Sequence, residues 1–140
     1  MTTGTWDGVR ISADTRSITD DTIDQGPCQK IFQKKGVYCA VAGDLGAAKK
    51  AALWLLGRKK NKPKLEDEEF EIILVSKDRQ EYYDESLVAL ELPTPHAIGS
   101  GKQPALAAML AGENGREAIR IAARIDPNTS VDYGLRSFKV

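Results

Sequence analysis

The residue with the clearest chemical potential is a threonine directly after the initiator methionine. The chain begins Met1-Thr2-Thr3, and the small side chain of Thr2 makes Met1 a candidate for removal. Thr2 would then carry both a nucleophile, its Oγ, and a candidate general base, its α-amine, because an α-amine has a pKa of ~7.7–8.0 and is partly neutral at cellular pH. The start of the chain therefore predicts a nucleophilic site that exists only after Met1 is gone. Many chains, however, begin Met-Thr without any catalytic role.

An expected N-terminal hairpin brings a carboxylate towards Thr2. Asp7-Gly8 is the dipeptide that accepts the positive φ angles of a two-residue type I′ turn, and β-forming residues flank it. This turn places Thr2 across from Ala13 and Asp14 beside the start of the chain. Strict alternation points Asp14 to the opposite face from Thr2, so direct contact would need a bulge or a distorted strand end.

Hydrophobic periodicity predicts the remaining elements. The expected strands are 31–32 with 37–42, then 70–76, 81–84, 87–92 and one or two within 131–140, and the expected helices are about 45–56, 104–111 and 116–125. A polar connector is expected over 61–69, and His96 is expected at an exposed turn. This order predicts an α+β fold in one domain, 1–140, with helices covering antiparallel sheets.

Composition argues against several classes of function. The 20 basic and 20 acidic residues cancel, so no overall field attracts nucleic acid or an anionic membrane. There is neither a long apolar stretch nor a signal pattern, which predicts a soluble, cytoplasmic protein. Two cysteines, Cys28 and Cys39, without CxxC spacing and a single histidine argue against a zinc site, a disulfide framework or a Ser-His-Asp site. Cys39 is expected in the core, and no cofactor or metal is expected.

Several short segments resemble one family in both order and content. They are Thr2-Thr3, Ile11-Ser12-Ala13-Asp14, Gln29-Lys30-Ile31, Val41-Ala42-Gly43-Asp44, Ala97-Ile98-Gly99-Ser100-Gly101, and Ala122-Ala123-Arg124-Ile125-Asp126 with Thr129. Each is common alone, but together they span nearly the whole chain. In this order they resemble the β-type proteasome subunits, in particular the HslV-type peptidases and their short bacterial and phage relatives.

The resemblance implies an N-terminal nucleophile hydrolase, a four-layer αββα sandwich with two antiparallel sheets between helical layers. It also implies threonine peptidase chemistry in which Thr2 attacks the scissile carbonyl and its amine takes the hydroxyl proton through a water. Lys30 would be the buried lysine beside the Thr2 Oγ, and Asp14 the carboxylate paired with it. A nearby cation favours deprotonated hydroxyl and amine groups, and a carboxylate offsets the cost of burying an ammonium.

The same resemblance assigns further positions. Gly43 would donate its backbone N–H to the oxyanion, Ala40 would form a wall of the substrate pocket, and Ser100, Asp126 and Thr129 would support the nucleophile. These assignments compete with simpler interpretations. Without the resemblance, Lys30 is an ordinary exposed strand lysine and Asp14 a turn residue that caps a strand. Gly43 also fits a tight strand-to-helix turn, and Asp126 fits a helix end before Pro127.

One departure from the family concerns assembly. The family usually has two long helices after the Gly43 region, whereas this chain has one helix followed by the charged connector, so one outer layer is expected to hold a single helix. The expected partners are further copies of the chain in a ring-like homo-oligomer, a polypeptide substrate and an AAA+ ATPase unfoldase. Because the family's helices help to stack rings, the shortened layer argues against the usual double ring.

Three functions remain open from the sequence. The first is a threonine-type endopeptidase inside a self-compartmentalised oligomer. The second is a non-catalytic or assembly protein that retains the fold and uses the shortened helical layer for a different interface. The third is an N-terminal nucleophile amidase acting on a small molecule, which the sequence does not separate from a peptidase because pocket walls are not visible in it.

Overall fold

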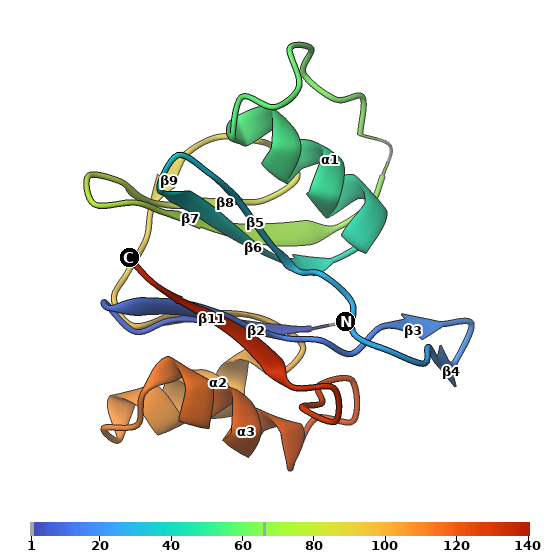
Figure 1. Ribbon diagram of the computed structural model, residues 1–140, viewed down its shortest axis with the longest axis vertical. Helices are drawn as coiled ribbons and strands as arrows, with labels where there is room; N and C mark the ends of the chain where they lie inside the picture. The colour runs from blue at the N-terminus through green and yellow to red at the C-terminus, as the bar shows by residue number, and fades with distance from the viewer. Residues whose placement is uncertain (1, 66) are drawn as a thin grey trace.

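Four layers make up the computed structural model, which describes residues 2–65 and 67–140. Two antiparallel sheets face each other, α1 (Leu45–Leu55) covers the outer face of one, and α2 (Lys102–Leu110) and α3 (Gly115–Ala123) cover the other (Figure 1). The αββα sandwich predicted for this chain is therefore confirmed, including the outer layer with a single helix. Among the described residues, no helix is long and apolar enough to cross a membrane.

The first sheet carries the start of the chain. Its strands, in spatial order, are β10 (His96–Gly99), β1 (Thr3–Trp6), β2 (Arg10–Asp14) and β11 (Leu135–Lys139). Antiparallel pairing sets Thr3 opposite Gly99 on one side of β1 and Gly4 opposite Ala13 on the other. The first residues of the chain are therefore held between two neighbouring strands.

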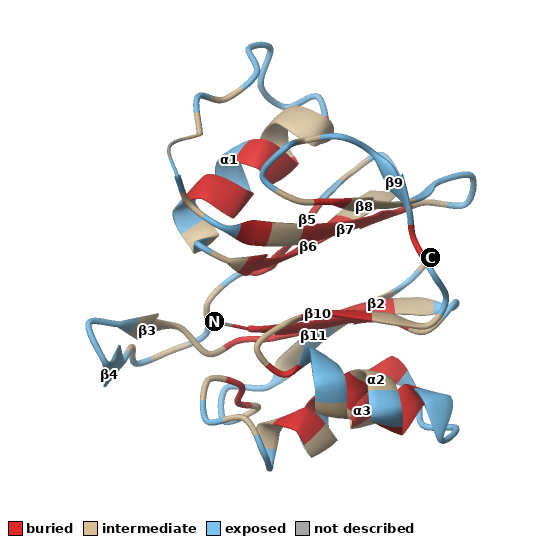
Figure 2. Ribbon diagram, turned by 180° about the vertical axis from the view of Figure 1, so that it is seen from behind, coloured by how far each residue is buried: buried red, intermediate tan, exposed pale blue. Residues whose placement is uncertain are grey.

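The second sheet has five strands. They are, in spatial order, β5 (Ile31–Lys34), β6 (Val37–Gly43), β7 (Phe70–Val75), β8 (Gln80–Tyr83) and β9 (Leu90–Glu91). Strands β6 and β7 are buried on both faces, as Figure 2 shows. Alternation accounts for this, because Cys39 and Val41 pack under α1 while Ala40 and Ala42 pack against the first sheet.

Small side chains let the layers approach closely. The buried face of α1 consists of four alanines, Ala47, Ala48, Ala51 and Ala52. The helix begins where the Asp44 side chain accepts a hydrogen bond from the Ala47 backbone N–H. This N-cap fixes the point at which the chain leaves β6 and turns onto the sheet.

The register of the first hairpin differs from the prediction by two residues. Trp6 pairs with Ile11 rather than Val9, because the Asp7 carboxylate accepts hydrogen bonds from the backbone N–H groups of Val9 and Arg10 and holds a longer turn. A two-residue shift in register leaves each side chain on the same face of the sheet, but it changes which residues lie opposite each other. Asp14 consequently lies one position beyond the Gly4–Ala13 pair, level with Thr3, and Thr2 does not lie across from Ala13.

Three further differences concern short strands. The prediction of His96 as an exposed turn residue is wrong, since it lies half-buried in β10 with its ring against Tyr82. The expected strand 87–92 is reduced to β9. A small hairpin, β3 (Ile18–Thr19) and β4 (Thr22–Ile23), has strands too short to give a periodic signal and was not predicted.

Candidate active site

Thr2 is buried with an unpaired hydroxyl. It directly precedes β1, has no exposed surface, and its Oγ1 finds no hydrogen-bond partner among the residues that the structure describes. The neighbouring backbone packs tightly, because a Cβ at Gly99 would lie 1.8 Å from the Thr2 carbonyl oxygen. A buried hydroxyl without a partner is costly and is uncommon outside functional sites.

Asp14 is held at the end of β2 by several donors. One carboxylate oxygen accepts from the Thr3 N–H at 3.1 Å and from Lys30 Nζ at 2.9 Å, and the other accepts from the Ser130 N–H at 3.1 Å and the Arg16 N–H at 3.4 Å. Asp14 thus contacts the backbone next to Thr2, and the structure records no contact between the two side chains.

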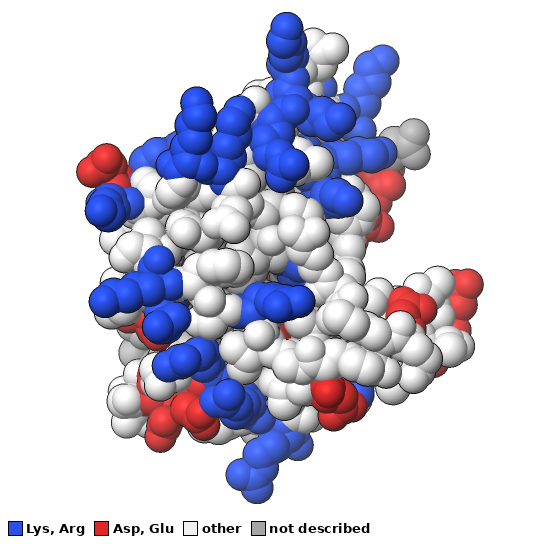
Figure 3. Space-filling view, viewed as in Figure 1, with Lys and Arg blue, Asp and Glu red and all other residues white. Residues whose placement is uncertain are grey.

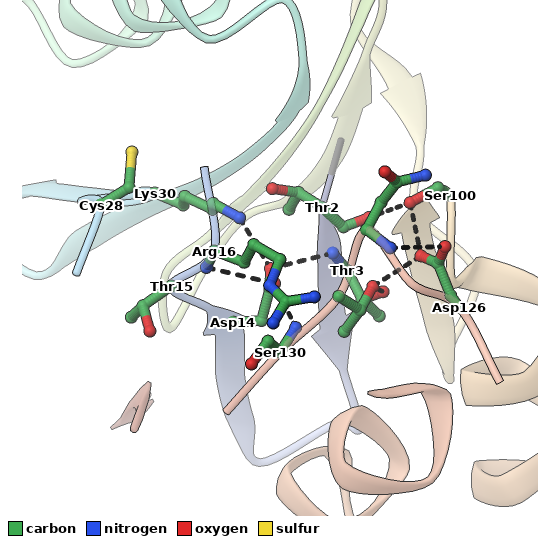
Figure 4. Close-up of polar contacts among 12 residues, drawn as sticks. Thr2, Thr3, Asp14, Thr15, Arg16, Cys28, Lys30, Ser100, Asp126 and Ser130 are labelled. Carbon is green, nitrogen blue, oxygen red and sulfur yellow. Dashed lines mark hydrogen bonds and ion pairs between the residues drawn. The ribbon is translucent and has the colours of Figure 1, made fainter. Parts of the chain in front are cut away.

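Lys30 joins the two sheets. Its side chain extends from the residue before β5, in the second sheet, to Asp14 in the first, and both side chains are 0% exposed. Burial lowers the pKa of the Lys30 ammonium below its ordinary value, although the Asp14 carboxylate opposes the shift. Figure 4 shows the Thr2 side chain extending towards the end of Lys30. A lysine that gives up its proton more readily than usual therefore lies next to the unpaired hydroxyl.

On the other side of Thr2 lies a network of hydroxyl groups around Asp126. The Ser100 hydroxyl donates to Asp126 at 2.5 Å and lies 3.5 Å from the Thr2 carbonyl oxygen. The Thr129 hydroxyl donates to the same Asp126 oxygen at 2.7 Å, and the Thr3 and Thr129 hydroxyls are 2.6 Å apart. Because Thr129 uses its proton on Asp126, Thr3 is the donor in this last bond. The network reaches both of the first two threonines (Figure 4).

The ionisation of Asp126 follows from this network. Burial alone would raise its pKa, but hydrogen bonds from Ser100, Thr129 and the Asn128 backbone outweigh burial and hold the pKa below its ordinary value. Asp126 is therefore a carboxylate at neutral pH. It also follows α3 before Pro127, so the interpretation as a helix end holds alongside the contact with Ser100.

Gly43 stands at a strained junction between β6 and α1. Its φ is +98°, and a Cβ there would lie 2.5 Å from the Glu69 carbonyl oxygen, so only glycine fits. Val41 N–H donates to Lys30 on the β5 side and Asp44 N–H to Glu69 on the β7 side. Because these directions alternate along a strand, the Gly43 N–H faces the β5 side, beyond the last β5 pairing.

A pocket of about 720 Å³ opens beside this junction, with Ala42, Gly43, Gly99 and Ser100 in its lining. Ala40, predicted as a pocket wall, lies elsewhere. Its side chain is fully buried in the core between the sheets and faces Gly4. Ala42 lies on the same face of β6 but two residues nearer to the strand end, and it lines the pocket together with Gly43.

The structure thus brings Thr2, Asp14 and Lys30 together on one side and Ser100, Asp126 and Thr129 together on the other, with Gly43 close by. Three other participants, Thr3, Ser130 and Glu71, are not among the site residues that the sequence predicts. Glu71 accepts from the Gly99 N–H at 3.1 Å, and its place in the apolar strand Phe70–Val75 is a signal that could have singled it out. Within 2–65 and 67–140, no cluster of His, Cys, Asp and Glu could hold a metal ion.

Comparison with solved structures gives the fold a context. The chain is similar to HslV from Trypanosoma brucei, with a TM-score of 0.71 and 19% identity over 99% of this chain and 97% of that one. It is also similar to Thiobacillus denitrificans BPH, with a TM-score of 0.69 and 20% identity for the complex with epoxomicin, and 0.67 and 17% for BPH alone. Each BPH comparison covers 99% of this chain, and 97% and 96% of the respective BPH chain.

No protein-family model matches the sequence, and neither does any curated protein. At these levels of identity, the structural similarity shows the fold alone. The chain has the fold of HslV, as its resemblance to that group predicts.

Proposed function

We propose that this chain is a threonine-type endopeptidase in which Thr2, freed by removal of Met1, attacks peptide bonds. The observation that carries the proposal is the fully buried Lys30–Asp14 pair beside the unpaired Thr2 hydroxyl. A buried ion pair contributes little net stability compared with apolar packing, so its presence next to a potential nucleophile suggests a chemical role.

The proposed reaction uses the two functional groups of Thr2. The α-amine, directly or through a water, takes the hydroxyl proton while Oγ forms a bond to the scissile carbonyl carbon. The peptide C–N bond then breaks, the proton passes to the leaving amine, and water hydrolyses the resulting ester. Lys30 would favour the deprotonated forms of both groups, and Asp14 would keep Lys30 in place.

The other candidate residues would position rather than react. Asp126 would fix the Ser100 hydroxyl beside the Thr2 carbonyl, and Thr129 would accept a hydrogen bond from Thr3. The Gly43 N–H, which faces away from β7, would donate to the oxyanion. We expect the substrate to be a polypeptide and the working form to be a ring-like homo-oligomer in the cytoplasm, with an AAA+ ATPase that supplies unfolded chains.

Two measurements on the same material test the proposal. Intact mass should show that Met1 is absent from protein purified from cells, and the purified protein should hydrolyse small peptide amides. Thr2→Ala should abolish turnover, whereas Thr2→Ser, which keeps a hydroxyl and an α-amine, should retain part of it. Retained Met1, or equal turnover by wild type and Thr2→Ala, would refute the proposal.

Epoxomicin, the compound bound to the Thiobacillus denitrificans protein, supplies an independent probe. Wild type should gain the mass of one epoxomicin molecule per chain, and Thr2→Ala should gain none. Labelling that is identical in the two proteins would place the reactive group elsewhere and contradict the assignment of Thr2.

The complete burial of Thr2 favours one alternative, a non-catalytic or assembly protein that retains the fold. That protein would fold and assemble with neither turnover nor epoxomicin labelling, even when Met1 is absent. A labelled Thr2 would exclude it. The same peptide assays address the third function, because an amidase specific for a small molecule would label with a reactive probe but leave peptide amides intact.

A further inference from the structure

A small hairpin projects from the body of the molecule. Residues 17–24, called the arm here, contain β3 and β4 and extend to one side of the first sheet (Figure 1). Two residue pairs link its strands, Ile18 with Ile23 and Thr19 with Thr22, and the Asp24 N–H donates to the Ser17 carbonyl at the base. A two-stranded hairpin is marginally stable in water unless another surface packs against it. The arm therefore has the form of an element that is completed by a partner.

Two free carboxylates occupy the tip of the arm. Asp20 and Asp21 have φ angles of +48° and +62°, a conformation that Gly or Asn adopts at lower cost in this kind of turn. Neither side chain has a hydrogen-bond or ion-pair partner among the described residues, whereas Asp24 accepts from Ser17 and Thr19 within the arm. The tip thus keeps two charges that its own fold does not use, next to Ile23, which is 43% exposed.

A complementary surface lies on the outer helical layer. A hollow of about 350 Å³, called the groove here, lies between α1 and the loop that follows it. Its lining consists of Lys49, Lys50, Leu53, Lys59, Lys60, Asn61 and Pro63. Figure 3 shows lysine and arginine side chains gathered over this pole of the molecule. Within 2–65 and 67–140, the structure records no ion pair for these four lysines.

From these two features we infer that the arm of one copy docks in the groove of a second copy. The hollow offers an apolar floor of Leu53 and Pro63 for Ile23, and a rim of lysines for Asp20 and Asp21. The chain has no net charge at pH 7, so two copies attract through these opposite patches without overall repulsion. Opposite charges at the contact would also fix which part of each copy meets the other.

The contact is head-to-tail. In Figure 1 the arm extends beside the first sheet, while α1 and its following loop lie across the second sheet, so the arm points away from the groove of its own chain. Each copy then offers one arm and one groove, and successive contacts either close into a ring or continue as an open chain. The association needs neither Thr2 nor peptidase activity.

Charge reversal and mixing test this contact. In sedimentation velocity at low salt, wild type should associate, and Asp20→Asn/Asp21→Asn, which preserves the turn, should weaken the apparent Kd about tenfold. Asp20→Lys/Asp21→Lys and Lys59→Glu/Lys60→Glu should each be monomeric alone. Their equimolar mixture should associate again, because each arm then meets a groove of opposite charge.

Matched controls change the net charge by the same amount elsewhere. Glu91→Lys/Glu113→Lys and Lys77→Glu/Lys139→Glu alter exposed residues outside the arm and the groove, and both should associate like wild type, as should Thr2→Ala. A wild type that stays monomeric, arm or groove variants that associate like wild type, or a mixture that stays monomeric would each overturn the inference. Circular dichroism of every variant confirms that it is folded.

Discussion

The two sides of Thr2 solve the problem of a buried carboxylate differently. On one side, Asp14 is 0% exposed and is neutralised by the Lys30 ammonium as well as by backbone N–H groups. On the other, Asp126 is only partly buried and is held by the hydroxyls of Ser100 and Thr129, without a cation among the recorded contacts. On the first side, an ammonium group balances the charge of Asp14. On the second side, neutral hydroxyl groups stabilise the charge of Asp126 through hydrogen bonds.

This difference separates two kinds of support. The Lys30–Asp14 pair connects the two sheets, so the position of the Lys30 ammonium depends on how the sheets pack against each other. The Asp126 network stays between the first sheet and the end of α3, and contacts the Thr2 and Thr3 groups that it positions. We therefore expect the first side to control proton affinity at Thr2 and the second to control its geometry.

Removal of the cation should have the largest effect. Lys30→Met leaves Asp14 buried with backbone donors only, and breaking a buried pair in this way typically costs roughly 3–5 kcal/mol of unfolding free energy. Denaturant unfolding measures that loss. Under the proposed function, peptide turnover should also fall to the level of Thr2→Ala.

The double variant Lys30→Met/Asp14→Asn distinguishes these two effects. It removes the uncompensated charge and should regain part of the stability, but it should not regain turnover. Turnover that recovers together with stability would show that the pair only holds the fold, and would contradict a role in proton affinity.

Disruption of the other side should cost less. Asp126→Asn keeps one oxygen acceptor for Ser100 or Thr129 but loses the charge that strengthens both bonds. The expected loss of stability is about 1–2 kcal/mol, by analogy with hydrogen bonds to charged groups. Turnover should fall through kcat, with KM nearly unchanged, because the network positions the backbone of Thr2 and Asp126 itself is not part of the pocket lining. An effect as large as that of Lys30→Met would erase the proposed distinction.

The pH dependence of stability checks the charge of Asp126. Since its folded pKa lies below the ordinary value of 3.8, the ionised carboxylate stabilises the fold above that value, and this contribution is lost as the pH falls through the folded pKa. The difference in unfolding free energy between wild type and Asp126→Asn should therefore be constant near neutrality and shrink below pH 3.8. A difference that grows on acidification would contradict the assigned shift.

Local patterns in the sequence were sufficient for most of the scaffold. The apolar runs of β6 and β7 and the helical spacing of α1 give the correct elements, because burial on one or two faces imposes those periods. The first hairpin shows where this reasoning ends. Its turn dipeptide suggested two residues, but the Asp7 carboxylate binds two N–H groups of its own loop and also the Gly115 N–H of α3, a tertiary contact that the pattern does not contain.

The site depends still more on tertiary contacts. The nearness of Asp14 to the start of the chain follows from a hairpin alone, although the level was wrong. Lys30 reaches Asp14 only because the two sheets stack, and on local grounds it is an ordinary surface lysine. The strand β10 was missed since its four residues lie between Pro95 and Ser100, yet its pairing with β1 brings Ser100 to Thr2.

The smallest predicted effect concerns the member of the Asp126 network nearest to Thr2. Ser100→Ala removes the contact to the Thr2 carbonyl but leaves Thr129 donating to Asp126, and it should cost about 1 kcal/mol of unfolding free energy. Ser100→Thr, which keeps the hydroxyl, is the matched control and should retain most turnover if the added methyl group fits. If the second side acts through geometry, Ser100→Ala should lower kcat several-fold while leaving the pH profile of turnover unchanged. A shifted profile would instead mean that Ser100 takes part in the proton balance now assigned to Lys30 and Asp14.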